Sequence, residues 1–67
     1  MQHKLYALRK SKDINMTTKD MASLLNIHVN TYREKEQSKS AFNLDEMFLI
    51  ADCFDMNMHD IFIPRSE

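Results

Sequence analysis

The sequence predicts an all-α fold, a compact bundle of five short helices in a single domain over residues 1–67. Two observations favour this class. Apolar residues recur at helical spacing in successive segments, and no alternating run is long enough for a β-strand. With an apolar share of 43%, the chain is typical of a folded domain rather than a disordered one. Because so short a chain buries only about 60% of its unfolded surface, a dimer or another partner would stabilise it.

The first two helices are predicted in the N-terminal third. The first spans residues 2–13, and its apolar face consists of Leu5, Leu8 and either Ala7 or Ile14. The second opens at Thr17, because Thr17 and Asp20 have the spacing of a capping box, in which both side chains pair with free N–H groups of a helix start. Its buried residues are expected to be Met21, Ala22 and Leu25, with Leu24 partly covered.

The remaining helices follow in order. The third covers Val29–Glu36 and buries Tyr32, and the stretch SKSAF after it is a loop. Asn43 and Glu46 form a second capping box at the start of the fourth helix. The core residues of that helix are expected to be Leu44, Met47, Phe48, Ile50, Ala51 and Phe54. The last helix is expected to be one short turn. Asn57 and Asp60 form a third capping box at its start, the turn contains Ile61 and Phe62, and Pro64 ends it.

The chain contains no glycine, although helix ends favour a residue that tolerates the left-handed conformation. Asn and Asp are the usual substitutes. Asn15, Asn26 and Asp55 stand where the first, second and fourth helices are expected to stop. We therefore expect these three residues to have positive φ angles.

The formal net charge of −1 hides an asymmetry. Residues 1–39 hold eight Lys and Arg against four acids, a net of +4, and residues 40–67 hold one against six, a net of −5. A basic end of this kind indicates an anion-binding face, with solvated helix surfaces as the alternative.

Several function classes are excluded at this stage. Cys53 is the only cysteine and is expected to be a small buried residue. The three histidines, His3, His28 and His59, are too scattered along the sequence for a metal site. We expect no metal, no cofactor and no small-molecule ligand. Because a five-helix chain of this size has no room for a substrate pocket, we also expect the chain not to be an enzyme. Without a signal peptide or the roughly 18 apolar residues of a membrane span, a reduced, cytoplasmic location is expected.

The segment from Leu5 to Phe62 resembles the Cro/CI-type (XRE) helix-turn-helix family, whose fold is that of a lambda-repressor-like DNA-binding domain. The positions that carry the resemblance are Met16, Thr17, Thr18, Ala22, Asn26, Ile27, Tyr32 and Glu36. Three residues depart from the family pattern: Thr18 replaces Gln, His28 replaces a Ser cap, and Lys35 replaces a buried aliphatic residue. The apolar stem of Lys35 could cover the edge of the core at that position. The spacing from the first helix to Thr17 is also about two residues longer than is usual in the family.

The resemblance implies that the second helix crosses the DNA backbone and the third enters the major groove. Base contacts are then expected from Val29, Asn30, Arg33 and Glu34. Phosphate contacts are expected from Thr18, Lys19, His28, Tyr32, Lys39 and Ser40. His28 could alternatively serve only as a neutral cap of the third helix. Glu36 is expected to face inward and pair with a base of the first helix such as Arg9.

These features together favour a sequence-specific transcriptional regulator that binds double-stranded DNA, a repressor of phage or mobile-element type acting as a homodimer on a palindromic operator. The alternative is a protein-interaction module of antitoxin or anti-repressor type. Its support is the weak net charge and the methionines near the C-terminal end, Met47, Met56 and Met58. The dimer contact is expected in the SKSAF loop, the end of the fourth helix and residues 56–67, with Phe62 and Ile63 foremost.

Overall fold

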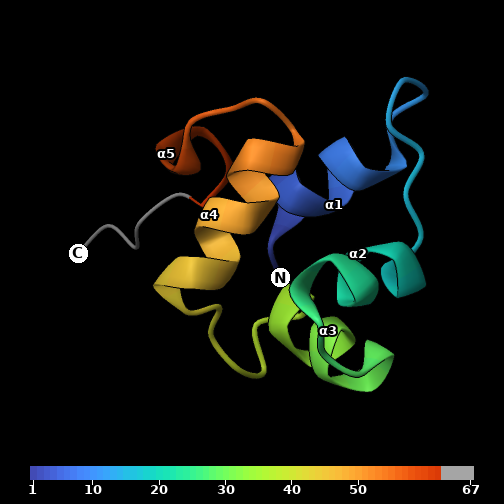
Figure 1. Cartoon of the computed structure of the whole chain (residues 1–67), viewed down its shortest axis with the longest axis vertical. Helices are drawn as coiled ribbons and strands as arrows, with labels where there is room; N and C mark the ends of the chain where they lie inside the picture. Colours follow the sequence, from blue (N-terminus) through green and yellow to red (C-terminus); the bar gives the residue numbers. More distant parts are fainter. Residues whose placement is uncertain (63–67) are drawn as a thin grey trace.

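The computed structural model describes residues 1–62, and all regular structure in that part of the chain is helical. The helices are α1 His3–Lys10, α2 Thr18–Leu25, α3 Val29–Glu36, α4 Leu44–Cys53 and α5 Met58–Ile61. The predicted all-α class is thus confirmed. α2 packs against α3 and α4, and α4 packs against α5. α2 and α3 lie together at one end of the molecule and α5 at the other, with α4 running between them (Figure 1). No helix within residues 1–62 has both the length and the apolar character needed to cross a membrane.

Two of the three predicted capping boxes are present. In α2, the Asp20 N–H donates to Thr17 Oγ1 at 3.1 Å and the Thr17 N–H donates to the Asp20 carboxylate at 2.9 Å. The same reciprocal pair opens α4, where the Glu46 N–H donates to Asn43 Oδ1 at 2.8 Å and the Asn43 N–H donates to Glu46 Oε1 at 3.0 Å. Each box satisfies two N–H groups that a helix start leaves without an intrahelical partner.

The third capping box is not formed. Asn57 Oδ1 accepts from the His59 N–H at 3.3 Å, and the Asp60 N–H donates to the main-chain oxygen of Asn57 at 2.9 Å. Asn57 therefore caps α5 by itself, which suits a helix of four residues. The predicted end of this segment at Pro64 lies outside the described residues.

Positive φ angles fall where the absence of glycine led us to expect them. Asn15, Asn26 and Asp55 have φ angles of 45°, 57° and 54°. Ser38, with φ 66°, is a fourth such residue that was not predicted, and it follows the end of α3. Asn26 shows what this conformation achieves, because its N–H reaches the main-chain oxygens of α2 and the chain turns sharply toward α3.

α1 is shorter than the predicted span of residues 2–13. It ends at Lys10, because Ser11 turns its backbone into an extended conformation and its hydroxyl donates to the main-chain oxygen of Leu8 at 2.9 Å. Leu5 is fully buried and Leu8 half-buried, as expected.

The core is small and continuous. Its buried apolar members are Leu5, Met21, Ala22, Leu25, Tyr32, Phe42, Ile50, Ala51 and Ile61. Every buried polar side-chain atom found within residues 1–62 has a hydrogen-bond partner. The ring of Phe42 links the two ends of this core, since its centroid lies 6.0 Å from Tyr32 and 5.3 Å from Phe62.

The predicted burial of α4 was wrong at three positions. Leu44 and Phe48 are 56% and 57% exposed, and Cys53 is exposed as well, with its sulfur 4.0 Å from Met16 Sδ. Ile50 and Ala51 are buried, as expected. Because α4 packs against the body of the protein on one side only, apolar residues outside the buried side remain at the surface.

Candidate nucleic-acid interface

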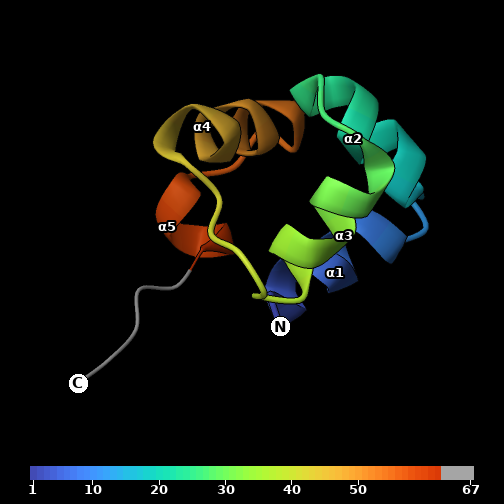
Figure 2. The same ribbon diagram turned by 90° about the horizontal axis from the view of Figure 1, so that it is seen from below.

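α3 begins directly after a tight turn from α2. The Ile27 N–H donates to the main-chain oxygen of Ala22 at 3.0 Å, which closes the turn that the left-handed Asn26 begins. Ala22 is buried and Ile27 half-buried, so a small residue on α2 and an aliphatic one in the turn fill the angle between the helices. Figure 2 views the molecule from below, with α3 in the foreground.

A buried ion pair fixes the C-terminal end of α3 against α1. Arg9 Nε and Nη2 donate to the two carboxylate oxygens of Glu36 at 3.0 and 3.1 Å, and the Tyr32 hydroxyl donates to Glu36 Oε2 at 2.7 Å. Arg9 Nη1 also donates to the main-chain oxygen of Met16 at 3.1 Å. The expected inward pairing of Glu36 with Arg9 is therefore confirmed.

The electrostatics of this cluster follow from its burial. Desolvation lowers the pKa of the Arg9 guanidinium, but the hydrogen bond and charge of Glu36 outweigh it, and the net pKa is raised. Burial, together with the hydrogen bond to Glu36, raises the pKa of Tyr32 well above its ordinary value. Arg9 therefore stays charged and Tyr32 stays neutral at any physiological pH, and the Glu36 charge is neutralised inside the protein.

Lys35 is also drawn away from the outer surface of α3. Its ammonium lies 3.1 Å from Glu46 Oε1 and donates to the main-chain oxygen of Ala41 at 3.0 Å. The stem therefore covers the edge of the core between α3 and α4, as its position in the family pattern led us to expect. Of the four charged side chains of α3, only Arg33 and Glu34 remain exposed.

The predicted base-contact residues share the outer side of α3. Asn30, Arg33 and Glu34 are exposed, and Val29 is half-buried at the start of the helix. Arg33 Nη1 donates to Asn30 Oδ1 at 3.4 Å, so these two side chains lie together.

His28 caps α3 through a ring nitrogen. Its Nδ1 accepts from the Asn30 N–H at 3.1 Å, and the residue is exposed. Accepting requires a lone pair on Nδ1, so in the neutral ring the proton is on Nε2. His28 therefore forms the expected cap, and in the neutral ring Nε2–H remains as a donor that could bind an anion.

The other predicted phosphate contacts lie at the start of α2 and in the loop after α3. Thr18 is half-buried, and Lys19, Lys39 and Ser40 are exposed. Tyr32 is a correction: its side chain is 0% exposed and its hydroxyl is bound to Glu36, so it cannot reach a phosphate. We expected Tyr32 to be a core residue and also to contact a phosphate, and it is a core residue only.

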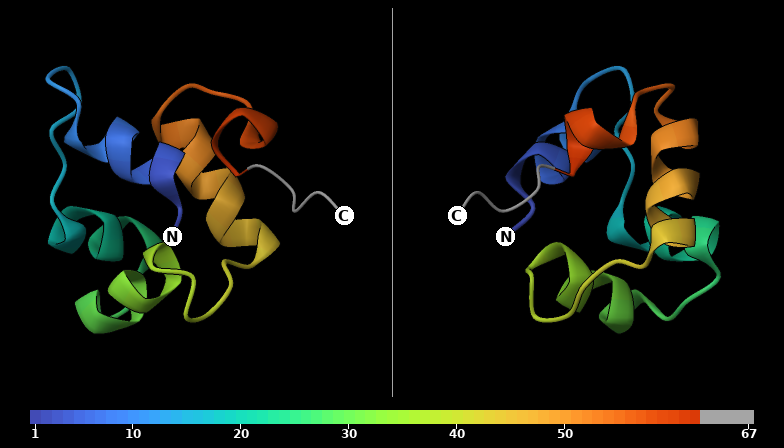
Figure 3. Two further views of the ribbon diagram at one scale, coloured as in Figure 1. Left: turned by 180° about the vertical axis from the view of Figure 1, so that it is seen from behind. Right: turned by 90° about the vertical axis from the view of Figure 1, so that its left-hand side faces the viewer.

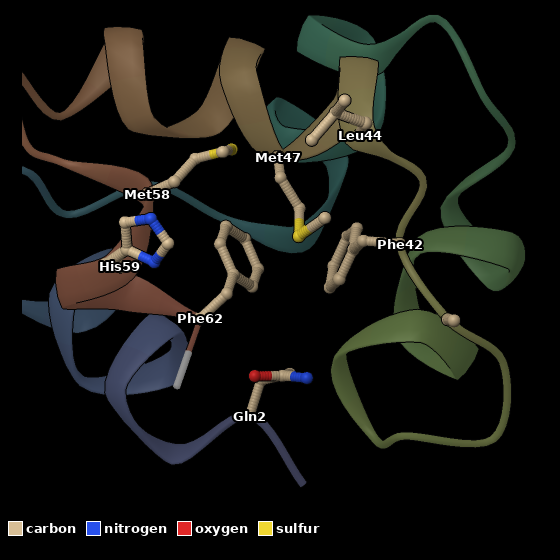
Figure 4. A pocket seen from close by; sticks show the side chains of 8 residues that line it. Gln2, Phe42, Leu44, Met47, Met58, His59 and Phe62 are labelled. Atoms are coloured by element: carbon tan, nitrogen blue, oxygen red, sulfur yellow. The ribbon is translucent and has the colours of Figure 1, made fainter. Parts of the chain in front are cut away.

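A hollow of about 420 Å³ opens on the opposite side of Phe42 from α3. The expectation that the bundle would have no room for a pocket was therefore wrong. Figure 4 shows the rings of Phe42 and Phe62 on either side of Met47, with Gln2 at one edge. The walls of this hollow are mainly apolar. None of the predicted contact residues of α3 lines it.

Comparison of the chain with protein-family models, with curated proteins and with solved structures gave no match.

Proposed function

We propose that this chain is a sequence-specific DNA-binding transcriptional regulator of the Cro/CI-type helix-turn-helix class. It acts as a homodimer on a palindromic operator and represses by occupying the promoter. The observation that carries the proposal is the arrangement of charge on α3. Asn30 and Arg33 lie side by side on the outer surface, while Glu36 is neutralised by Arg9 inside. The outer surface of α3 thereby carries the Asn30 amide and the Arg33 guanidinium beside one carboxylate, that of Glu34, instead of two.

The chemistry of the outer surface suits base edges in a major groove. An Asn amide pairs with both N6 and N7 of adenine, and an Arg guanidinium pairs with O6 and N7 of guanine. Glu34 can accept from the amino group of cytosine, and the Val29 side chain suits the methyl group of thymine. These four residues are the proposed readers.

The phosphate contacts are proposed at the helix starts and in the following loop. The exposed ammonium groups of Lys19 and Lys39 supply charge, and Thr18 and Ser40 supply hydroxyls. His28 adds its Nε2–H at the N-terminus of α3, where the helix dipole also favours an anion.

Selection from random double-stranded DNA followed by sequencing tests the proposal. We expect enrichment of a palindrome whose half-sites are about 34–36 Å apart, which is one helical turn. Binding to the selected site should weaken steeply as salt rises, because counterions are released from the phosphates. Recovery of no common sequence, or binding that does not respond to salt, would contradict it.

One observation favours a second function, that of a protein-interaction module. Leu44, Phe48 and Leu49 are large apolar side chains of α4 that are about half exposed. A protein that used this surface for a partner instead of reading DNA would keep its binding at high salt. Substitutions at Asn30 or Arg33 would then leave its function unchanged.

A further inference from the structure

The loop that follows α3 carries two of the proposed phosphate contacts. Residues 38–42, the SKSAF loop, lie in the yellow segment that joins α3 to α4 (Figure 3). Lys39 and Ser40 are exposed on this loop. A loop that has to be ordered on binding loses conformational entropy, and this loss weakens the binding. The contacts that hold the loop before binding therefore affect how well its two polar residues reach an anion.

The first residues of the loop are bonded to the last turn of α3. The Ser38 N–H donates to the main-chain oxygen of Lys35 at 3.1 Å. The N–H groups of Lys39 and Ser40 donate to the main-chain oxygen of Glu34 at 2.8 and 3.4 Å. The positive φ of Ser38, 66°, lets the chain turn back in this way. Because Glu34 is a proposed base reader, the loop begins directly on the proposed reading helix.

The far end of the loop is anchored in the core. Phe42 is 8% exposed, and its ring packs against those of Tyr32 and Phe62. Between the two anchored ends lies Ala41, which is exposed. Its main-chain oxygen accepts from the Lys35 ammonium at 3.0 Å. Lys35 therefore holds the loop at the point where the chain leaves α3 for the core.

The Lys35 ammonium is itself held by Glu46. It lies 3.1 Å from Glu46 Oε1, and the two side chains are only 14% and 10% exposed. The same oxygen accepts from the Asn43 N–H in the capping box of α4, so the carboxylate has a fixed position. Packing alone does not require a charge here, because an apolar side chain of similar length would cover the same edge of the core without the desolvation of an ion pair. The contribution that only an ammonium makes is the bond to Ala41.

We propose that Lys35 is a positioning residue for DNA binding, whose ammonium, fixed by Glu46, holds the SKSAF loop in the shape that presents Lys39 and Ser40 to a phosphate. This inference rests on the proposed function. Glu46 neutralises the charge of Lys35, so Lys35 acts through the loop and not by attracting DNA directly. A loop that is already held loses less entropy when it binds.

The test uses a variant that removes the bond without changing the net charge. Lys35→Met combined with Glu46→Gln deletes one charge of each sign. Gln at the third helical position keeps the capping box of α4, and Met fills the place of the lysine stem. Replacing a buried ion pair by uncharged groups of similar volume is often neutral for stability or stabilising. Lys35→Met alone, which keeps Glu46, is a second variant. Lys12→Met combined with Asp13→Asn, an exposed pair after α1, is the matched control.

Amide hydrogen exchange without DNA measures how firmly the loop is held. In the double variant and in Lys35→Met, the amides of Lys39 and Ser40 should exchange about tenfold faster or more, because local opening of the loop becomes easier. The Ile27 amide, which closes the turn between α2 and α3, is the internal reference and should be unchanged. The control pair should alter none of these rates. Unchanged exchange at Lys39 and Ser40 in both variants overturns the inference.

Binding to a random-sequence DNA duplex over a range of salt concentrations measures the consequence. In the natural chain, Lys39→Ala should reduce the salt slope by about one. In the Lys35→Met, Glu46→Gln background, the same substitution should reduce it by less than about half as much, because a loosened loop no longer presents Lys39. A residue that only stabilises the fold would leave the effect of Lys39→Ala the same in both backgrounds. Equal reductions therefore overturn the inference.

The proposed function fails by a different result. A natural chain that selects no DNA sequence and binds the random duplex without a salt response refutes DNA reading, whatever the exchange rates of the loop are. A natural chain that selects a palindrome, with loop exchange unchanged in the variants, refutes only the role of Lys35.

Discussion

Arg9 and Glu36 lie 27 residues apart in the sequence and form a buried ion pair with two parallel hydrogen bonds. Glu36 receives a third bond from the Tyr32 hydroxyl, and Arg9 bonds the main-chain oxygen of Met16. The pair therefore joins α1, the segment before α2 and the end of α3. It sets the orientation of α3 and keeps a carboxylate off its outer surface.

The first prediction concerns the stability that this pair supplies. Arg9→Met or Glu36→Leu alone should lower the free energy of unfolding by about 3–5 kcal/mol, because each leaves a buried charge without its partner. The double variant should lose less than the sum of the two, since an apolar pair fills the same space. Urea unfolding followed by circular dichroism measures all three. Lys10→Met, one residue from Arg9 and exposed, is the control; a comparable loss there would contradict the special role of the pair.

The second prediction is a pH dependence. Burial, with the hydrogen bond to Glu36, raises the pKa of Tyr32 above the unfolded value of about 10. A pKa that is raised in the folded state gives stability that is complete below the unfolded pKa and is lost as pH rises above it. The free energy of unfolding should therefore decline above about pH 10.

Tyr32→Phe should abolish that part of the decline, and Tyr6→Phe should not. Thermal unfolding between neutral pH and pH 11 measures the difference. Equal alkaline slopes in the natural chain and Tyr32→Phe would show that another group is responsible.

The local features of the fold could be predicted because each depends on a few neighbouring residues. Asn26 and Asp55 were expected to have positive φ angles, and both do, since Asn and Asp tolerate that conformation best in a chain without glycine. Ser38 could not be predicted, because serine has no such preference. The two reciprocal capping boxes were identified from spacing alone. The third is absent because Asn57 Oδ1 accepts from the His59 N–H, while the Asp60 N–H donates to the main-chain oxygen of Asn57.

The features that depend on what lies opposite a helix could not be predicted. The segment LDEMFLIADCF is apolar on more than one side, so periodicity does not show which side is buried. Leu44 and Phe48 were therefore assigned to the core, although α4 is covered on one side only. The hollow between Phe42 and Phe62 depends on how α4 and α5 meet the preceding loop, and no sequence signal specifies it.

The third prediction separates base reading from phosphate contact. Asn30→Ala should lose about 1–3 kcal/mol on the selected site and little on random DNA, because a contact to a base edge is removed. Lys39→Ala should weaken both alike and reduce the salt slope by about one. Competition binding at two salt concentrations measures these changes. If Asn30→Ala left the ratio of specific to random binding unchanged, α3 would not be the reading helix.

The last prediction uses the two ring nitrogens of His28, which have different roles. Nδ1 caps α3 by accepting from the Asn30 N–H, which leaves Nε2–H as the free donor of the neutral ring. His28→Ala removes both roles and should cost about 1 kcal/mol of folding free energy through the lost cap. His28→Ser restores a cap, because a serine hydroxyl accepts from the same end of the helix, so its stability should equal or exceed that of the natural chain. Only the outer donor is then missing. If that donor contacts a phosphate, His28→Ser should weaken binding to selected and random DNA equally, and His3→Ser, an exposed histidine on α1, should not. Full DNA affinity in a stable His28→Ser variant would leave His28 as a cap alone and move the proposed contact away from the start of α3.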